Sequence, residues 1–221
     1  MEGMLERERD QVADAARRLA AAGLVAGTSG NVSARRDDRV AITPTGGVLA
    51  ELEPDQVTVV DLDGRVIEGS FAPTSEIDLH LSVYGRFGSG SVVHSHAPMA
   101  TALSCVLDEL PCVHYEMLML GGTVRVAPYA TFGTPEPARA VVEALEGRTA
   151  ALMANHGAVT HGADVAAAVR ATELLEWAAT VYWNAHAIGT PRVLDDAQQQ
   201  AVVEAAVGRN YGRVQAAEQA S

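Results

Sequence analysis

The chain contains no lysine, because all sixteen of its basic residues are arginine. Catalysis through a lysine Schiff base is therefore excluded, and so is a Walker-type phosphate loop, which needs a lysine. If this protein makes or breaks carbon–carbon bonds, a metal ion must stabilise the carbanion.

Cysteine, apolar runs and net positive charge are also scarce. Cys105 and Cys112 form no CxxC pair, which predicts reduced, packed thiols. No stretch of about 18 apolar residues occurs, and the N-terminal segment MEGMLERERDQ lacks the apolar region of a signal peptide. We therefore expect a cytoplasmic protein with no membrane partner. The net charge of −12 argues against nucleic acid as a partner, so a local site must hold any anionic substrate.

The composition is that of one soluble globular domain spanning residues 1–221, with 48% hydrophobic and 20% charged residues. No linker, repeat or low-complexity segment divides the chain. Strands predicted over 39–43, 57–61 and 65–67 follow one another directly, which favours an antiparallel sheet. Helices are predicted over 4–22 and 164–186.

The stretch SVVHSHAPMATA contains the strongest chemical signal. His94 and His96 lie two apart at the end of a predicted strand, so both imidazoles leave the same face. A catalytic metal needs a third ligand, and His156 in ALMANHGAV also follows an apolar, strand-like run. Each histidine alone is more often structural, but together they predict a zinc site whose open position takes a substrate oxygen. His161 and His186 are expected at the surface.

Two glycine-rich turns carry hydroxyl groups, GTSGNVSARR and PTGG. Their backbone N–H groups can face an anion, although ordinary tight turns are the alternative. Neither turn has GxGxxG or GxxxxGK[ST] spacing, which excludes a dinucleotide or Walker loop.

The segment APTSE opens a predicted helix. Thr74 or Ser75 is a natural N-cap, which would place the positive end of the helix where a phosphate could sit. Glu76 is then either a first-turn carboxylate favoured by the helix dipole or a catalytic group. His80, one turn later, is expected to be packed or hydrogen-bonded rather than a ligand.

Seven motifs in a fixed order carry a family resemblance: GTSGNVS, ITPTG, PTSE, VVHSHA, HY, APYATFGT and NHG. Together they resemble the class II aldolase/adducin family, and within it the L-fuculose-phosphate aldolases, from the first helix to about residue 211. The resemblance implies a three-layer α/β fold with a mainly antiparallel central sheet flanked by helices. It also implies a C4 homotetramer with active sites between subunits.

The resemblance assigns roles to individual residues. Glu76 matches the family's acid/base glutamate, Tyr115 a proton donor supplied by a neighbouring subunit, and Tyr211 a C-terminal tyrosine. One Zn²⁺ per subunit, or another divalent ion such as Mn²⁺, Co²⁺ or Fe²⁺, would be bound by the family's histidines, which match His94, His96 and His156. The phosphate-binding set matches Thr28, Gly30, Asn31, Thr45, Gly46, Thr74 and Ser75.

The implied activity is the reversible cleavage of a ketose 1-phosphate, such as L-fuculose 1-phosphate, to dihydroxyacetone phosphate and an aldehyde. Sugar-phosphate decarboxylases, dehydratases and 4-epimerases of the same fold are alternatives, although the epimerase usually has aspartate at position 76. A non-catalytic adducin-like interaction domain is an alternative of a different class. That domain lacks the metal ligands, so the three histidines together with Glu76 argue against it.

Overall fold

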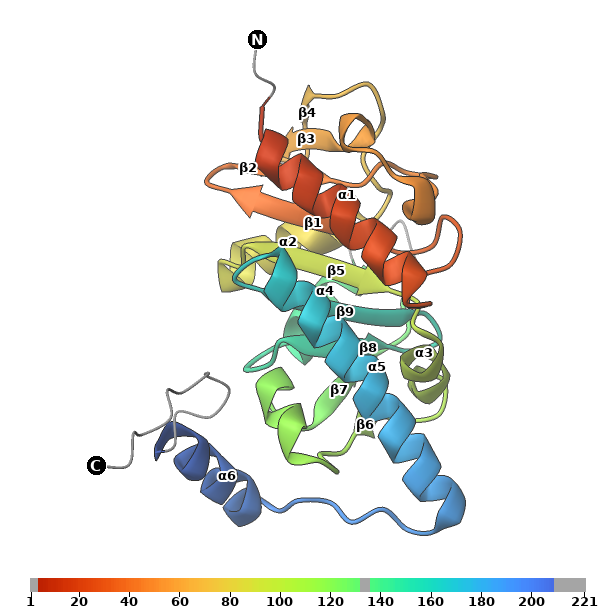
Figure 1. Ribbon diagram of the computed structural model, residues 1–221, viewed down its shortest axis with the longest axis vertical. Helices are drawn as coiled ribbons and strands as arrows, with labels where there is room; N and C mark the ends of the chain where they lie inside the picture. Colours follow the sequence, from red (N-terminus) through yellow and green to blue (C-terminus); the bar gives the residue numbers. More distant parts are fainter. Residues whose placement is uncertain (1–3, 132–135, 209–221) are drawn as a thin grey trace, which may run out of the picture.

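A computed structural model describes residues 4–131 and 136–208 of the chain. Within these residues, nine strands form one sheet in the order β4-β3-β2-β1-β5-β9-β8-β7-β6 (Figure 1). All neighbouring strands are antiparallel except β7 and β8, which run parallel. The strands are β1 Asn31–Arg36, β2 Arg39–Ile42, β3 Thr58–Asp61, β4 Val66–Glu68, β5 Ser91–Ser95, β6 Glu109–Leu110, β7 Val124–Ala127, β8 Ala150–Met153 and β9 Gly157–Gly162.

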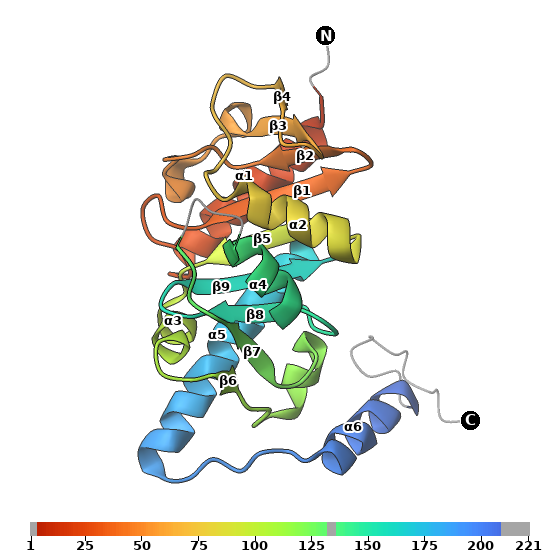
Figure 2. The ribbon, with the colours of Figure 1, turned by 180° about the vertical axis from the view of Figure 1, so that it is seen from behind.

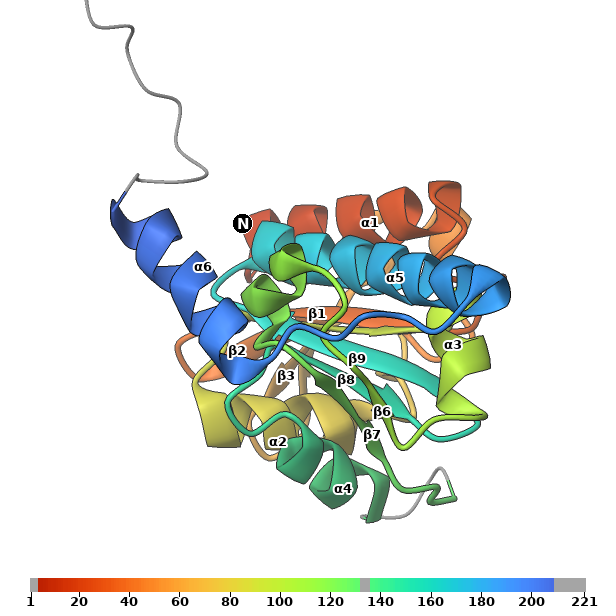
Figure 3. The ribbon, with the colours of Figure 1, turned by 90° about the horizontal axis from the view of Figure 1, so that it is seen from below.

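Helices cover both faces of this sheet and make three layers (Figure 3). Helices α1 and α5 pack on one face, and α2 and α4 pack on the other, as the view from behind also shows (Figure 2). The mixed, mainly antiparallel α/β fold predicted from the sequence is therefore confirmed. The helices are α1 Glu6–Ala21, α2 Ile77–Phe87, α3 Pro98–Ser104, α4 Glu136–Ala144, α5 Val165–Ile188 and α6 Asp196–Gly208, with 3₁₀ helices η1 Leu49–Glu51, η2 Pro54–Gln56 and η3 Tyr115–Leu120.

Strand β5 lies at the centre of the sheet, and every one of its residues is buried. Helices cover this strand on both sides, so residues on both of its faces are buried and its sequence SVVHS does not alternate between apolar and polar residues. Separate apolar clusters fill the two sides of the sheet. The first of the candidate metal ligands, His94, therefore lies on a fully buried strand.

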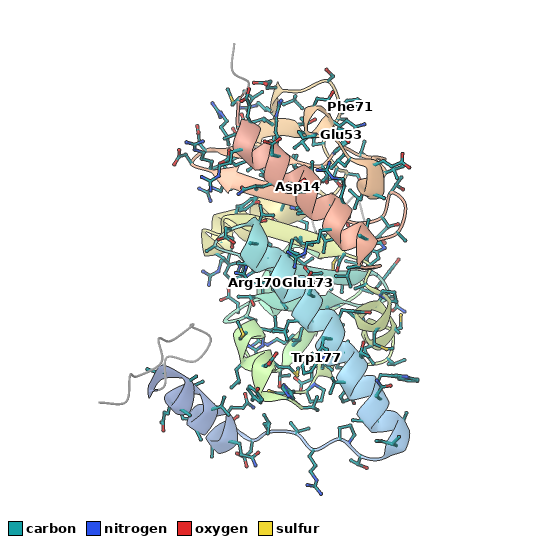
Figure 4. The ribbon with its side chains drawn as sticks, viewed as in Figure 1. Asp14, Glu53, Phe71, Arg170, Glu173 and Trp177 are labelled. Carbon is teal, nitrogen blue, oxygen red and sulfur yellow. The ribbon has the colours of Figure 1, made fainter. Side chains whose placement is uncertain are left out.

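Helices α1 and α5 lie side by side on the face seen in Figure 4. The Arg18 guanidinium on α1 donates to the Glu173 carboxylate on α5 at 2.7 Å. Arg170 and Trp177 lie on either side of Glu173 along α5 and are exposed. No helix in the described part of the chain is long and apolar enough to cross a membrane.

The structure also tests the burial predicted for the two cysteines, His161 and His186. Both cysteines are free thiols, but only Cys112 is packed, since Cys105 is exposed at the end of α3. His186 is exposed as expected, whereas the surface prediction for His161 is wrong. The His161 ring is buried because the Ser89 hydroxyl (2.7 Å) and the Arg148 carbonyl (3.0 Å) satisfy its two nitrogens.

Candidate active site

The ends of three neighbouring central strands, β1, β5 and β9, lie side by side. Strand β5 pairs antiparallel with both β1 and β9, so its C-terminal end lies beside the N-terminal ends of its two neighbours. In this register His94 lies opposite Asn31 of β1 and opposite Val159 of β9. The turn that precedes β9 contains His156, and it therefore reaches the HSH motif across sixty residues of sequence.

The three predicted ligand histidines converge. Their ring centroids lie 4.8–5.1 Å apart, and one ring nitrogen of each lies within 4.8 Å of the others. The Nε2 atoms of His94 and His96 are only 2.9 Å apart. The Nδ1 atom of His94 hydrogen-bonds the Ala158 carbonyl at 3.0 Å, which fixes the ring and leaves Nε2 facing the cluster.

The β8–β9 turn presents His156 through two special backbone positions. Asn155 adopts the left-handed conformation at φ 56°, which asparagine tolerates better than most residues, and the His156 amide donates to the Met153 carbonyl at 3.0 Å. Gly157 follows, where a Cβ would lie 2.4 Å from the Ser95 carbonyl oxygen. The conformation of the turn thus favours asparagine at position 155, and its close approach to β5 requires glycine at position 157.

Glu76 reaches the histidine cluster from the N-terminal end of α2. Its Oε2 lies 3.3 Å from His94 Nε2, and its Oε1 lies 3.5 Å from His156 Nε2. The Asn31 amide donates to Oε2 at 2.8 Å. The N-cap of α2 is Glu76 itself, so the prediction of Thr74 or Ser75 at this position is wrong.

Thr74 and Ser75 do not cap the helix, because the chain just before it pairs with the segment that follows β2. The Thr74 amide donates to the Thr43 carbonyl at 3.0 Å, and Pro44 and Pro73 form an antiparallel bridge. Thr74 Oγ1 still accepts a 3.3 Å hydrogen bond from the Glu76 amide. The hydroxyl therefore orders the chain just before the helix rather than capping its first turn.

Burial and mutual contact set the charge states in the cluster. Burial lowers the pKa of His94 to about 4 and also lowers the pKa of His96, so both rings are neutral at pH 7. Burial alone would raise the pKa of Glu76. The neighbouring His94, the Asn31 amide and the other histidines outweigh it and lower that pKa overall, so Glu76 is a carboxylate. Neutral imidazoles beside a carboxylate are the donor forms that a metal ion binds.

This donor set fits a divalent cation. Three imidazole nitrogens near one point match the protein ligands of catalytic zinc sites, in which each Zn–N bond is about 2.0–2.1 Å. The His94 hydrogen bond to a backbone carbonyl supplies the outer support that such ligands need. Glu76 lies close enough to bind the same ion or to face a substrate bound there.

A cavity of about 170 Å³ opens directly beside the cluster. Two hydroxyl-rich turns and the start of α2 form its wall, and His96, His156 and Glu76 form its inner side. The Thr45 amide donates to the Ala72 carbonyl at 3.0 Å, which joins the second turn to the segment before α2. All seven residues of the predicted phosphate set line this cavity: Thr28, Gly30, Asn31, Thr45, Gly46, Thr74 and Ser75.

Gly30 brings the first turn into close contact with the end of strand β5. Its φ is +91°, and a Cβ would lie 2.7 Å from Val25 Cγ1 and 2.9 Å from the His94 carbonyl oxygen. Only glycine fits this conformation and this separation. The neighbouring Asn31 side chain is already engaged by Glu76 and His80, so one amide hydrogen remains for a ligand.

Tyr115 does not line this cavity within one chain. It lies on η3, partly exposed, with its ring 4.5 Å from the His114 ring, which in turn contacts Trp177 of α5. Its predicted role requires a neighbouring subunit and stays a prediction. Tyr211 lies outside the described residues.

The comparisons with known proteins agree with this geometry. The profile described as Class II Aldolase and Adducin N-terminal domain matches residues 10–183. The chain belongs to the class II aldolase and adducin family. A relative named 5-deoxy-D-ribulose 1-phosphate aldolase, from Bacillus thuringiensis serovar kurstaki, is 36% identical over 200 residues, which cover 89% of this chain and 94% of the relative.

Other members of the class II aldolase and adducin family give the same picture. A Rhodospirillum rubrum relative named 5-methylthioribulose-1-phosphate/5-deoxyribulose-1-phosphate aldolase is 38% identical over 198 residues, 89% of each chain. A solved structure named L-fuculose 1-phosphate aldolase superposes with a TM-score of 0.87 at 34% identity, covering 93% of this chain and 97% of that one. The family resemblance and the fold expected from the sequence are thus confirmed.

Sequence reasoning missed several residues around the site. Ser29 and Pro44 also line the cavity. Ser33 and Tyr84 join His80 in a buried polar chain behind Glu76. The sequence held one signal for this polar chain. Ser33 lies two residues after Asn31, so on a strand both side chains leave the same face.

Proposed function

We propose that this protein is a metal-dependent aldolase that reversibly cleaves a ketose 1-phosphate into dihydroxyacetone phosphate and an aldehyde. The observation that supports it most is the joint placement of three imidazoles and one carboxylate beside a hydroxyl-lined cavity. The named relatives that this chain resembles are aldolases of sugar 1-phosphates.

The histidine cluster would hold one Zn²⁺ or a related divalent ion per subunit through His94, His96 and His156. When bound, such an ion acts as a Lewis acid and stabilises the negative charge that develops on a substrate oxygen. The absence of lysine fits this assignment, because the alternative aldolase chemistry needs a lysine amine.

The chain's own groups supply the remaining steps. The cavity hydroxyls and backbone amides would bind the substrate phosphate and fix its carbon chain next to Glu76. Cleavage of the C3–C4 bond leaves the electron pair on C3. The Glu76 carboxylate would carry the proton to and from that carbon. In cleavage the C4 hydroxyl loses its proton as it becomes the aldehyde oxygen. In a homotetramer with sites at its interfaces, Tyr115 of a neighbouring subunit would take up this proton and would donate it back to the aldehyde oxygen in the condensation direction.

Other reactions of the same fold would use the same donors, so the products decide between them. Dihydroxyacetone phosphate plus an aldehyde indicates an aldolase. Carbon dioxide indicates a decarboxylase, loss of water a dehydratase, and an inverted hydroxyl an epimerase. A purified protein that binds no divalent ion would instead support an adducin-like interaction domain.

The test is a panel of ketose 1-phosphates assayed for release of dihydroxyacetone phosphate, with and without a chelator. The panel includes L-fuculose 1-phosphate, 5-deoxyribulose 1-phosphate and 5-methylthioribulose 1-phosphate. We expect release from at least one member, loss of release with the chelator, and recovery on adding Zn²⁺. No triose phosphate from any member would contradict the proposal.

Glu76→Gln gives a sharper test of the residue assignment. The amide keeps the shape of Glu76 but cannot take up a proton, so turnover should fall by about 10²–10⁴-fold. Metal content should stay at the wild-type level, because the three imidazoles remain. An unchanged rate of triose phosphate release would remove Glu76 from the proton-transfer role.

A further inference from the structure

A buried chain of hydrogen bonds runs from Glu76 into the core between α2 and β1. Asn31 Nδ2 donates to Glu76 Oε2 at 2.8 Å, and Asn31 Oδ1 faces His80 Nε2 within hydrogen-bonding distance. His80 Nδ1 lies 2.7 Å from the Ser33 hydroxyl, which lies 2.6 Å from the Tyr84 hydroxyl. We refer to these five residues as the polar ladder.

The ladder alternates between residues of α2 and residues of β1, because the distance between successive side chains on one face is nearly the same in both elements. Glu76, His80 and Tyr84 are spaced four residues apart at the start of and along α2, a rise of about 6 Å per step. Asn31 and Ser33 are spaced two apart on β1, about 6.7 Å per step. Each strand side chain therefore inserts between two helix side chains, and the contacts continue in register.

The carboxylate fixes the direction of every hydrogen bond in the ladder. Ionised Glu76 only accepts, so the amide nitrogen of Asn31 must face it and the amide oxygen must face His80. An amide oxygen also only accepts, so His80 must carry its proton on Nε2. Nδ1 of the neutral ring then accepts from the Ser33 hydroxyl, and Ser33 accepts from Tyr84.

The burial of the ladder supports a single arrangement. His80 is fully buried and Tyr84 is 1% exposed, so no solvent can replace a lost partner. Burial also lowers the pKa of His80 to about 3, which keeps the ring neutral with one donor and one acceptor nitrogen.

We infer that His80 is a positioning residue: by donating from Nε2 to Asn31, it locks the Asn31 amide so that its N–H holds the Glu76 carboxylate in place for proton transfer. His80 touches neither the cavity nor the three histidines through any hydrogen bond of the described residues. Its effect on the reaction passes through Asn31, whose amide oxygen also fixes the tautomer of the His80 ring. This inference depends on the proposed aldolase function for its kinetic readout only.

The test compares two substitutions at one site with a structural control. His80→Leu removes both ring hydrogen bonds, whereas His80→Gln keeps an N–H donor near the Nε2 position. Thr172→Val is the control, because Thr172 is a buried α5 residue whose hydroxyl contacts Thr160 Oγ1 at 2.7 Å on the other side of the sheet. All three variants lose buried hydrogen bonding, but only those at His80 affect the ladder.

We expect His80→Leu to lower kcat by about 10–100-fold, as loss of an outer support for a reacting group does, with KM changed less than about threefold. His80→Gln should recover most of the loss, and Thr172→Val should retain the wild-type kcat despite lower thermal stability. Metal content should be equal in all four proteins. A wild-type kcat in His80→Leu, or equal losses in the Leu and Gln variants, would overturn the inference.

The His80 tautomer provides a readout that needs no activity. In the metal-loaded wild-type protein, ¹⁵N chemical shifts of the ring should show a protonated Nε2 and an unprotonated Nδ1. A proton on Nδ1 would overturn the inference even if His80→Leu fails to fold. If the wild-type protein cleaves no ketose 1-phosphate but His80 shows the expected tautomer, the proposed function fails while the ladder stands.

Discussion

Gly157 offers the most direct test of how the fold brings the third ligand to the site. A Cβ at this position would lie 2.4 Å from the Ser95 carbonyl oxygen, 3.1 Å from His96 Cδ2 and 3.4 Å from His94 Cε1. Carbon and oxygen normally approach no closer than about 3.3 Å, so Gly157→Ala must move β9 away from β5 by about 1 Å. The end of β5 and the turn before β9, which carry the three candidate ligand histidines, meet at this point.

The size of the effect follows from that displacement. Overpacking of this kind costs about 1–3 kcal/mol of folding free energy, and each kcal/mol lowers Tm by about 2–4 °C in a protein of this length. A shift of about 1 Å at a reacting centre can also cost about 10²-fold in rate. We therefore expect Gly157→Ala to lose thermal stability, zinc affinity and turnover together.

Gly85→Ala is the matched control for this experiment. Gly85 lies in α2, is exposed, and a Cβ there would meet nothing within 4 Å. Because alanine favours the helix, this variant should gain about 0.5–1 kcal/mol of stability and keep the wild-type zinc affinity. Thermal unfolding and competition with a chelating dye measure both quantities. If Gly157→Ala matches the wild type in Tm and zinc affinity, the close packing of the NHG turn does not determine the site.

Three further predictions concern the cation, pH and helix α5. Removing the cation with a chelator should lower Tm, and saturating Zn²⁺ should restore it. The reason is that a ligand at 100 times its Kd adds about 2.7 kcal/mol to the free energy of unfolding. An unchanged Tm would contradict a cation site that exists only in the folded protein. Burial lowers the pKa of His161, so between pH 6.5 and that lower value the unfolded state binds the extra proton. Stability should therefore fall as the pH drops below 6.5, and His161→Gln should show a shallower fall in denaturant titrations; equal slopes would refute this. Asp164 caps α5 by accepting from the Ala167 amide at 2.7 Å, so Asp164→Ala should cost about 1 kcal/mol in the same assay, whereas no loss would show the cap to be dispensable.

The local parts of the site could be predicted from the sequence because local geometry determines them. Two histidines two residues apart on a strand must share a face, and glycine with hydroxyl residues must form turns. Those rules were enough to select His94, His96 and the two turns that line the cavity. The helix predicted from Asp164 matches α5, whose N-cap is Asp164, and the two strands predicted over 57–61 and 65–67 pair as the hairpin of β3 and β4.

Two features that the sequence did not predict depend on partners far along the chain. His161 is buried because Ser89, 72 residues away, supplies a hydroxyl to its ring. Glu76, rather than Thr74 or Ser75, is the N-cap of α2 because the preceding residues pair with the segment after β2. No local pattern encodes such pairings, since strand order is set by contacts between distant segments.

The charge distribution gives a physical reason for the proposed metal site and the proposed phosphate site to be adjacent. The chain carries a net charge of −12, and among the described residues that line the cavity there is no arginine, while Glu76 adds a negative charge. Hydroxyls, backbone amides and the N-terminal end of α2 contribute only partial positive charge. A divalent cation on the three imidazoles would therefore be the largest positive charge near a bound phosphate, so the affinity for a phosphorylated sugar should depend on the cation as strongly as the chemistry does.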